Sequence, residues 1–143
     1  MAAKGSTFDN DLLKLIFNAT SIANIAIDAT SSPLTNLYVA LHTASPLAGG
    51  SQTTSEAAYS GYARVAVART SGGWTVTSNS VSPAANIVFP AAASGTETLT
   101  HFSVGTVSSG AGKILYFGAI SPSISVTTGV APLLTTATAI TES

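Results

Sequence analysis

The chain has 143 residues, of which 8% are charged and none is cysteine, and this length allows a single domain with one hydrophobic core. Five Lys and Arg residues with a net charge of -1 cannot form the cationic surface that nucleic acid requires, and no apolar run is long enough to span a bilayer. We therefore expect residues 1–143 to form one domain with no nucleic-acid and no membrane partner, and without disulfides or thiolate metal sites.

The first predicted element is a helix over residues 6–27. Ser6 and Asp9 have the spacing of a capping box. Pro33 cannot continue a helix, so the segment before it should end the element. Apolar residues recur at spacings of three and four and would share one face: Phe8, Leu12, Leu15, Ile16, Ala19, Ala23 and Ala26.

From Asn36 onward the apolar residues alternate, which is typical of β-strands. The turn Ser71-Gly72-Gly73 is expected to join two of these strands as a hairpin. The predicted strands are 37–42, 62–69, 74–78, 87–89, 98–107, 113–120, 124–126 and 133–140. Many short strands at spacings of roughly 8 to 12 residues are typical of antiparallel sandwiches. We predict a mainly β protein, in which residues 36–143 form an antiparallel β-sandwich of jelly-roll type behind one N-terminal α-helix.

A long polar loop should follow the first strand. Ser45–Ser60 contains Pro46, Gly49 and Gly50 together with many small polar residues. Loops of this length and composition are usually exposed and often contact a partner. We expect short insertions near Gly49-Gly50 to leave the fold intact.

The titratable residues are too few and too scattered to form an obvious active site. His42 and His101 are a poor start for a metal site without cysteine, and we expect them to lie on sheet faces, with one or both hydrogen-bonded. Asp9 and Asp11 would point to different sides of a helix, and no Gly-x-Ser-x-Gly elbow occurs. We predict no catalytic residues, no cofactor and no metal, and hence no enzyme. A carbohydrate-active enzyme or lysin is the enzymatic alternative, and the lack of an acid–base pair disfavours it.

The segment Ser109-Gly-Ala-Gly-Lys113 is similar to the end of a phosphate-binding loop. The full motif needs glycine and Ser or Thr where this chain has Val107 and Ile114. The segment also leads into a predicted strand, so no helix N-terminus would face a phosphate. We expect a hairpin turn here.

Tyr62 and Trp74 flank the Ser71–Gly73 turn. They could form a sugar-stacking platform or an interface anchor. A cross-strand aromatic pair that closes one end of the core is the interpretation we favour. The residues that we consider candidates for an interface are Phe8, Leu12, Leu15, Ile16, Tyr62 and Trp74.

Two parts of the sequence carry a resemblance to a known family. One is Asn36-Leu-Tyr-Val-Ala-Leu-His-Thr-Ala-Ser-Pro46, followed by Tyr59-Ser-Gly-Tyr-Ala-Arg-Val-Ala-Val67, and the other is Phe8-Asp-Asn-Asp-Leu-Leu-Lys-Leu-Ile-Phe17. Together they resemble a family of small virion proteins of tailed bacteriophages, whose members are tail-fibre-like proteins or head decoration (cement) proteins. The resemblance implies a structural protein of the phage particle and carries over no catalytic residue.

The resemblance implies one of two roles. We expect a capsid decoration protein on the head surface, which binds the major capsid protein and itself as a homo-oligomer and so stabilises the assembled head. The alternative is a tail-fibre or receptor-binding module of the phage tail. The apolar helix face could cover a sheet edge or face of its own subunit or dock on a neighbouring protein, and its position at the chain end favours docking.

Overall fold

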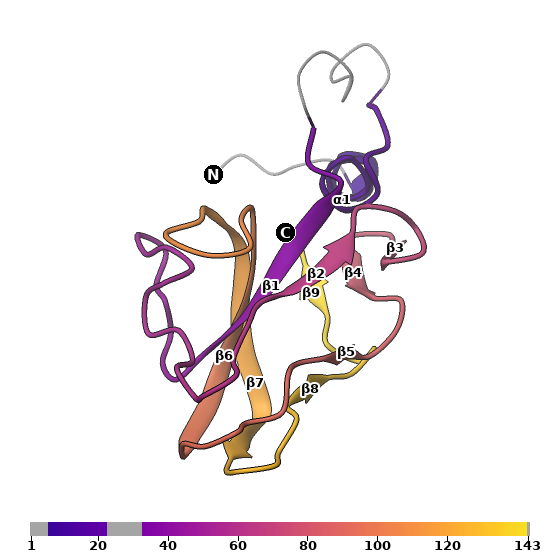
Figure 1. The fold of residues 1–143 in the computed structure, drawn as a ribbon. Coiled ribbons are helices and arrows are strands. Elements are labelled where there is room, and N and C mark those ends of the chain that lie inside the picture. Colours follow the sequence, from indigo (N-terminus) through magenta and orange to yellow (C-terminus); the bar gives the residue numbers. More distant parts are fainter. Residues whose placement is uncertain (1–5, 23–32, 143) are drawn as a thin grey trace. The chain divides into compact units, whose positions relative to one another are not determined.

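The structure is a computed structural model that describes residues 6–22 and 33–142. Within these ranges the chain is mainly β with one α-helix and antiparallel strand pairs, as predicted (Figure 1). The jelly-roll arrangement stays a prediction, and so does the single domain. The elements are α1 (Ser6–Asn18), β1 (Asn36–His42), β2 (Val65–Ala68), β3 (Trp74–Thr77), β4 (Ser80–Pro83), β5 (Ile87–Val88), β6 (Glu97–Gly105), β7 (Ile114–Val126), β8 (Leu133–Leu134) and β9 (Ile140–Thr141).

The described residues group into two compact units. The first takes them from Met1–Asn36, Val67–Asn86 and Thr135–Ser143, and contains α1 with the sheet β3-β4-β9. The second takes them from Leu37–Ala66 and Ile87–Leu134, and contains β1, β6 and β7 together with the two-stranded sheet β5-β8. Each unit is therefore built from segments that are distant in sequence.

The helix α1 is shorter than the predicted helix over residues 6–27. It ends at Asn18, because Ala19 has a φ of 52° and the Thr20 amide donates to the Lys14 carbonyl at 3.1 Å. A left-handed residue directly after the last turn is a common way to end a helix. The predicted residues 23–27 lie outside the described part of the chain.

Arg69 closes the C-terminal end of α1. Its Nε donates to the Ile16 carbonyl at 2.7 Å, and its Nη2 donates to the Leu15 carbonyl at 2.8 Å. The last four carbonyls of a helix have no partner within the helix, so the guanidinium satisfies two of them and places a positive charge where the helix dipole favours it.

The buried face of α1 is offset by one residue from the predicted face. Leu13 and Phe17 are fully buried, and the Phe17 ring meets Trp74 edge-on at a centroid distance of 4.8 Å. Phe8 is 39% exposed, and the other predicted face residues that are apolar and large are half-buried: Leu12, Leu15 and Ile16. Apolar residues cover a wide arc of this helix, so their spacing alone does not show which face is buried. The contact between Phe17 and Trp74 determines the buried face.

The predicted hairpin at Ser71–Gly73 is wrong. β3 pairs antiparallel with β4 through the two-residue loop Ser78-Asn79, and β2 lies beside β1 in another sheet. Ser78 has a φ of 54°, and a positive φ at the first loop position is typical of tight hairpin turns. The segment before β3 instead forms a compact turn, in which the Gly73 amide donates to the Thr70 carbonyl at 3.0 Å.

In the second unit, β1 is covered on both faces. It pairs antiparallel with β6, and β6 pairs antiparallel with β7, within the sheet order β2-β1-β6-β7. Leu37, Val39 and Leu41 are buried on one face of β1, and Ala40 and His42 are buried on the other. The second face is covered largely by the segment that follows β1.

Candidate functional site

The segment that follows β1 folds back along its own strand. The Thr43 amide donates to the Ser55 carbonyl at 2.9 Å, and the Ala57 amide donates to the Leu41 carbonyl at 2.9 Å. Gln52 within this segment is fully buried. The prediction of an exposed loop over Ser45–Ser60 is therefore confirmed only in part. Main-chain hydrogen bonds hold the segment to the sheet, and four of its residues are buried while seven are exposed: the buried ones are Pro46, Gln52, Ala57 and Tyr59.

The tip of this segment, residues 47–49, is its longest exposed stretch. Leu47 is 67% exposed, and a side chain added at Gly49 would meet nothing within 4 Å. A Cβ at Gly50, by contrast, would lie 2.0 Å from the Pro46 carbonyl oxygen. The region in which insertions should be tolerated is thus narrowed to residues 47–49.

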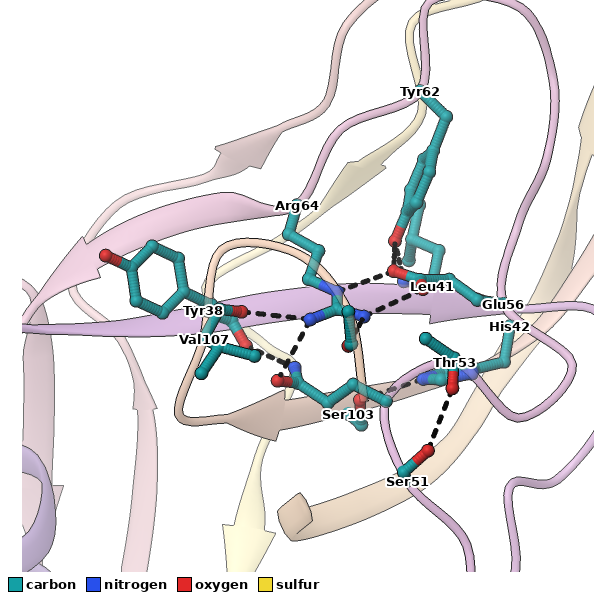
Figure 2. A network of polar contacts seen from close by, with 12 residues as sticks. Tyr38, Leu41, His42, Ser51, Thr53, Glu56, Tyr62, Arg64, Ser103 and Val107 are labelled. Carbon is teal, nitrogen blue, oxygen red and sulfur yellow. Dashed lines mark hydrogen bonds and ion pairs between the residues drawn. The ribbon is translucent and has the colours of Figure 1, made fainter. Parts of the chain in front are cut away.

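Arg64 links three segments of the second unit (Figure 2). Its Nε and Nη2 donate to the two carboxylate oxygens of Glu56 at 2.6 and 2.8 Å. Its Nη1 and Nη2 donate to the carbonyls of Val107 and Gly110, at 3.0 and 2.7 Å, in the turn between β6 and β7. The side chains of Arg64 and Glu56 are 2% and 17% exposed. The hydrogen bond to Glu56 raises the pKa of the Arg64 guanidinium, so this group stays charged.

Gln52 joins the folded-back segment to the same turn. Its Nε2 donates to the Tyr38 carbonyl at 2.9 Å, and its main-chain amide donates to the Gly112 carbonyl at 3.0 Å. A Cβ at Gly105 would lie 2.1 Å from the Gln52 side chain, and one at Gly112 would lie 2.5 Å from it. The Gln52 amide therefore occupies the space that glycine leaves at both positions. Since β6 and β7 pair on either side of this turn, Ser109–Lys113 lies in a hairpin turn, as predicted.

Tyr62 completes the polar network above β1. Its hydroxyl accepts from the Leu41 amide at 3.1 Å and donates to Glu56 Oε1 at 3.0 Å. Burial, and then the nearby Glu56 carboxylate, raise the pKa of the Tyr62 phenol. Its ring stacks on Phe89 and meets Tyr59 edge-on.

Tyr62 and Trp74 do not form the predicted cross-strand pair. Trp74 lies opposite Pro83 on the neighbouring strand and packs against Phe17 within the first unit. The prediction assumed a hairpin between two strands that carry the rings, but Tyr62 lies before the start of β2, and β2 does not pair with β3. Both aromatic rings therefore pack mainly against other residues of their own unit.

His42 is buried with both ring nitrogens engaged. Nδ1 lies 2.9 Å from the Thr54 carbonyl, and Nε2 lies 2.8 Å from Ser103 Oγ. A carbonyl can only accept, so Nδ1 carries the proton and Nε2 of the neutral ring accepts from the Ser103 hydroxyl. Burial lowers the pKa of the imidazole. The prediction that His42 is a hydrogen-bonded sheet residue is confirmed. His101 lies opposite it on β6, with Nδ1 2.9 Å from Thr100 Oγ1.

The hydrogen-bond network fixes the positions of the folded-back segment and the β6–β7 turn. The ionisable side chains within it are bound to other groups of the protein. Among residues 6–22 and 33–142 no three His, Asp or Glu side chains gather as a metal site would require, and no helix there is long and apolar enough to cross a membrane. The candidate interface residues are divided between the units. Phe8, Leu12, Leu15, Ile16 and Trp74 lie in the first, and Tyr62 lies in the second.

Sequence reasoning missed Arg64, Glu56 and Gln52. A signal for the ion pair was present, because two opposite charges eight positions apart stand out in a chain with so few charged residues. Nothing in the sequence singles out Gln52, since its role depends on the glycines of a turn that is distant along the chain.

Comparison with known families places the chain among the structural proteins of the bacteriophage virion, as the resemblance predicted. The family model that matches is described as "Podophage GP4 fiber I protein gp80" and aligns with residues 6–141. Because this match covers nearly the whole chain, the protein belongs to that family. None of the curated proteins compared with it gives a match.

Proposed function

We propose that the protein is a structural component of a podophage tail fibre. The observation that carries this proposal is the family match over residues 6–141, whose description names a fibre protein. The fibre role was the alternative at the level of sequence, and the family description favours it over head decoration. The protein would then act by protein–protein contact and not as an enzyme, and it would need neither cofactor nor metal.

The polar network supports a structural role. Arg64, Glu56 and Tyr62 bind one another within a largely buried cluster, and Arg64 also holds the turn after β6. Side chains committed in this way are poorly placed to move protons for catalysis, whereas they do fix the shape of the surface that a neighbouring protein meets. A fibre subunit needs such a fixed surface.

The exposed side of α1 is one candidate contact with other virion proteins. Phe8 is 39% exposed, and Leu12 and Ile16 are half-buried, whereas Leu13 is part of the core. We expect the double variant Leu12→Asp with Ile16→Asp to stay folded and to lose binding to virions. Leu13→Asp is the matched control, and it should unfold the first unit because it places a charge in an apolar core. Normal virion binding by the folded double variant would remove the docking role.

An epitope inserted at Gly49 tests the location of the protein. This position lies at the open tip of the folded-back segment, so a short tag should neither unfold the protein nor be hidden. Immunogold labelling of tagged phage should place gold on the tail fibres. Gold on the head surface would instead support a decoration protein bound to the major capsid protein, and would overturn the fibre proposal.

A further inference from the structure

A short piece of the folded-back segment separates His42 from solvent. His42 is fully buried, and its Nδ1 donates to the Thr54 carbonyl at 2.9 Å. On the other side its Nε2 accepts from the Ser103 hydroxyl of β6 at 2.8 Å (Figure 2). Residues 53–55, which we call the strap, contain the Thr54 carbonyl. Thr53 and Ser55 are exposed and Thr54 is half-buried, so the strap has solvent on its outer side.

The strap lies between two fixed points of the folded-back segment. Before it, the Gln52 main-chain amide donates to the Gly112 carbonyl at 3.0 Å. After it, the Glu56 carboxylate binds the Arg64 guanidinium through two hydrogen bonds. We call these two contacts the anchors. Because they hold the chain on both sides, movement of the strap does not require movement of the whole segment.

Between the anchors the strap is tied to the end of β1 at two points. The Thr54 carbonyl accepts from His42, and the Ser55 carbonyl accepts from the Thr43 amide at 2.9 Å. The strand itself pairs with β6 over five residues, from Tyr38 to His42. The strap can therefore leave His42 with far less loss of pairing than separation of the two strands would cause.

A protonated His42 would have no free counter-ion. The charged and titratable groups that act on it are Glu56 of the folded-back segment, Arg64 before β2, and His101, which lies opposite it on β6. Both carboxylate oxygens of Glu56 already accept from Arg64, and one of them also accepts from the Tyr62 hydroxyl. Arg64 and a charged His101 would repel an imidazolium. The charge could then be stabilised only by water.

We propose that the strap is a cover that opens in acid, so that protonation of His42 releases residues 53–55 from β1 while the anchors and the pairing of β1 with β6 stay intact. A buried charge without a partner is costly, and opening the strap brings water to the ring. The groups that lose their hydrogen bonds lie near the surface and can bind water instead. The surface of the folded-back segment would then differ between neutral and acidic solution. This inference does not depend on the fibre proposal.

The uptake of one proton determines how steeply opening depends on pH. Burial lowers the pKa of His42 from its ordinary value of 6.5 while the strap is closed. As the pH falls below that value, the open form binds the proton before the closed form does. The equilibrium constant for opening should therefore rise about tenfold for each unit of pH, until the closed form is protonated as well.

Amide hydrogen exchange of the full chain measures this opening. The Thr43 amide reports on the strap, because its acceptor is the Ser55 carbonyl. The Gln52 and Ala57 amides report on the chain at the two anchors. Between pH 6.5 and pH 5.5 the protection of Thr43, corrected for the intrinsic exchange rate, should fall about tenfold, and the other two amides and those of β6 should change much less. Protection of Thr43 that does not change with pH, or that falls together with the β6 amides, would overturn the proposal.

Two matched variants assign the effect to one imidazole. His42→Gln cannot take up a proton, so the protection of Thr43 should not depend on pH in this variant. His101→Gln removes an imidazole from the same face of the sheet and leaves His42 in place, so the fall should remain. A fall that persists in His42→Gln, or that disappears in His101→Gln, would overturn the proposal. If His42→Gln does not fold, the wild type and His101→Gln still decide the matter.

Discussion

Arg64 and Glu56 meet through two parallel hydrogen bonds, of 2.6 Å from Nε and 2.8 Å from Nη2, in an almost fully buried setting. Two-point contacts of this kind fix geometry as well as charge. Here the geometry matters because the same guanidinium holds the Val107 and Gly110 carbonyls. The ion pair thus sets the relative position of the folded-back segment and the β6–β7 turn.

Breaking this pair on one side should be costly. Arg64→Met leaves the Glu56 carboxylate without its ion-pair partner, and we expect a loss of about 3–5 kcal/mol in the free energy of unfolding. Denaturant titration of the variant measures this loss. In the double variant Arg64→Met with Glu56→Gln no unpaired charge remains, so its loss should be smaller than the sum of the two single losses. Additive losses would show that the two side chains act independently.

The folded-back segment should distinguish its two adjacent glycines. In Gly50→Ala the new methyl group would meet the Pro46 carbonyl, so the main chain must shift, and we expect a loss of about 1–3 kcal/mol. Gly49→Ala makes the same chemical change in open space and should leave the melting temperature nearly unchanged. Equal effects in the two variants would mean that the segment is not packed against itself near Pro46.

His42 should make the fold sensitive to acid. Burial lowers the pKa of His42 from its ordinary value of 6.5. As the pH falls below that value, the unfolded chain binds a proton at His42 before the folded chain does, so the free energy of unfolding falls. In the neutral ring Nε2 accepts a hydrogen bond from the Ser103 hydroxyl. After protonation Nε2 carries a hydrogen and can no longer accept this bond. The variant His42→Gln has no imidazole, so the free energy of unfolding should fall less steeply with decreasing pH than in the wild type. Denaturant titrations at several pH values measure this dependence. If the free energy of unfolding depends on pH in the same way in both proteins, other groups cause the sensitivity to acid.

The end of α1 should depend on the guanidinium donors of Arg69. Arg69→Met removes the donors to the Ile16 and Leu15 carbonyls, and we expect a loss of about 1.5–3 kcal/mol. Lys113→Met removes an exposed cation from the second unit and is the control for net charge. Circular dichroism during denaturation follows both. If Arg69→Met loses its helical signal at the same denaturant concentration as Lys113→Met, the Arg69 cap contributes little to the stability of α1.

The sequence predicts which segments form strands better than it predicts which strands pair with each other. Alternation identifies β1 and β6, which have buried faces, and β7, where half-buried and exposed side chains alternate from Tyr116 to Ile120. The hairpin at Ser71–Gly73 is wrongly predicted because local turn signals do not reveal that Trp74 packs on Phe17 and lies opposite Pro83. The end of α1 is missed for a similar reason, since the cap comes from Arg69, which is far away along the chain.

The polar network was the least accessible part. Polar composition predicts an exposed loop, yet Gln52 is buried because Gly105 and Gly112 leave room for it. That complementarity exists only after β1, β6 and the folded-back segment have come together. No local pattern contains it.

A cryo-EM reconstruction of the whole virion tests the central claim most directly. The paired sheet of β1, β6 and β7, with the folded-back segment against β1, is a distinctive shape to fit into density. The fibre account predicts that this shape fits the tail fibres and is absent from the outer surface of the head. A good fit to the head lattice, with no copy in the fibres, would contradict it and restore the decoration role.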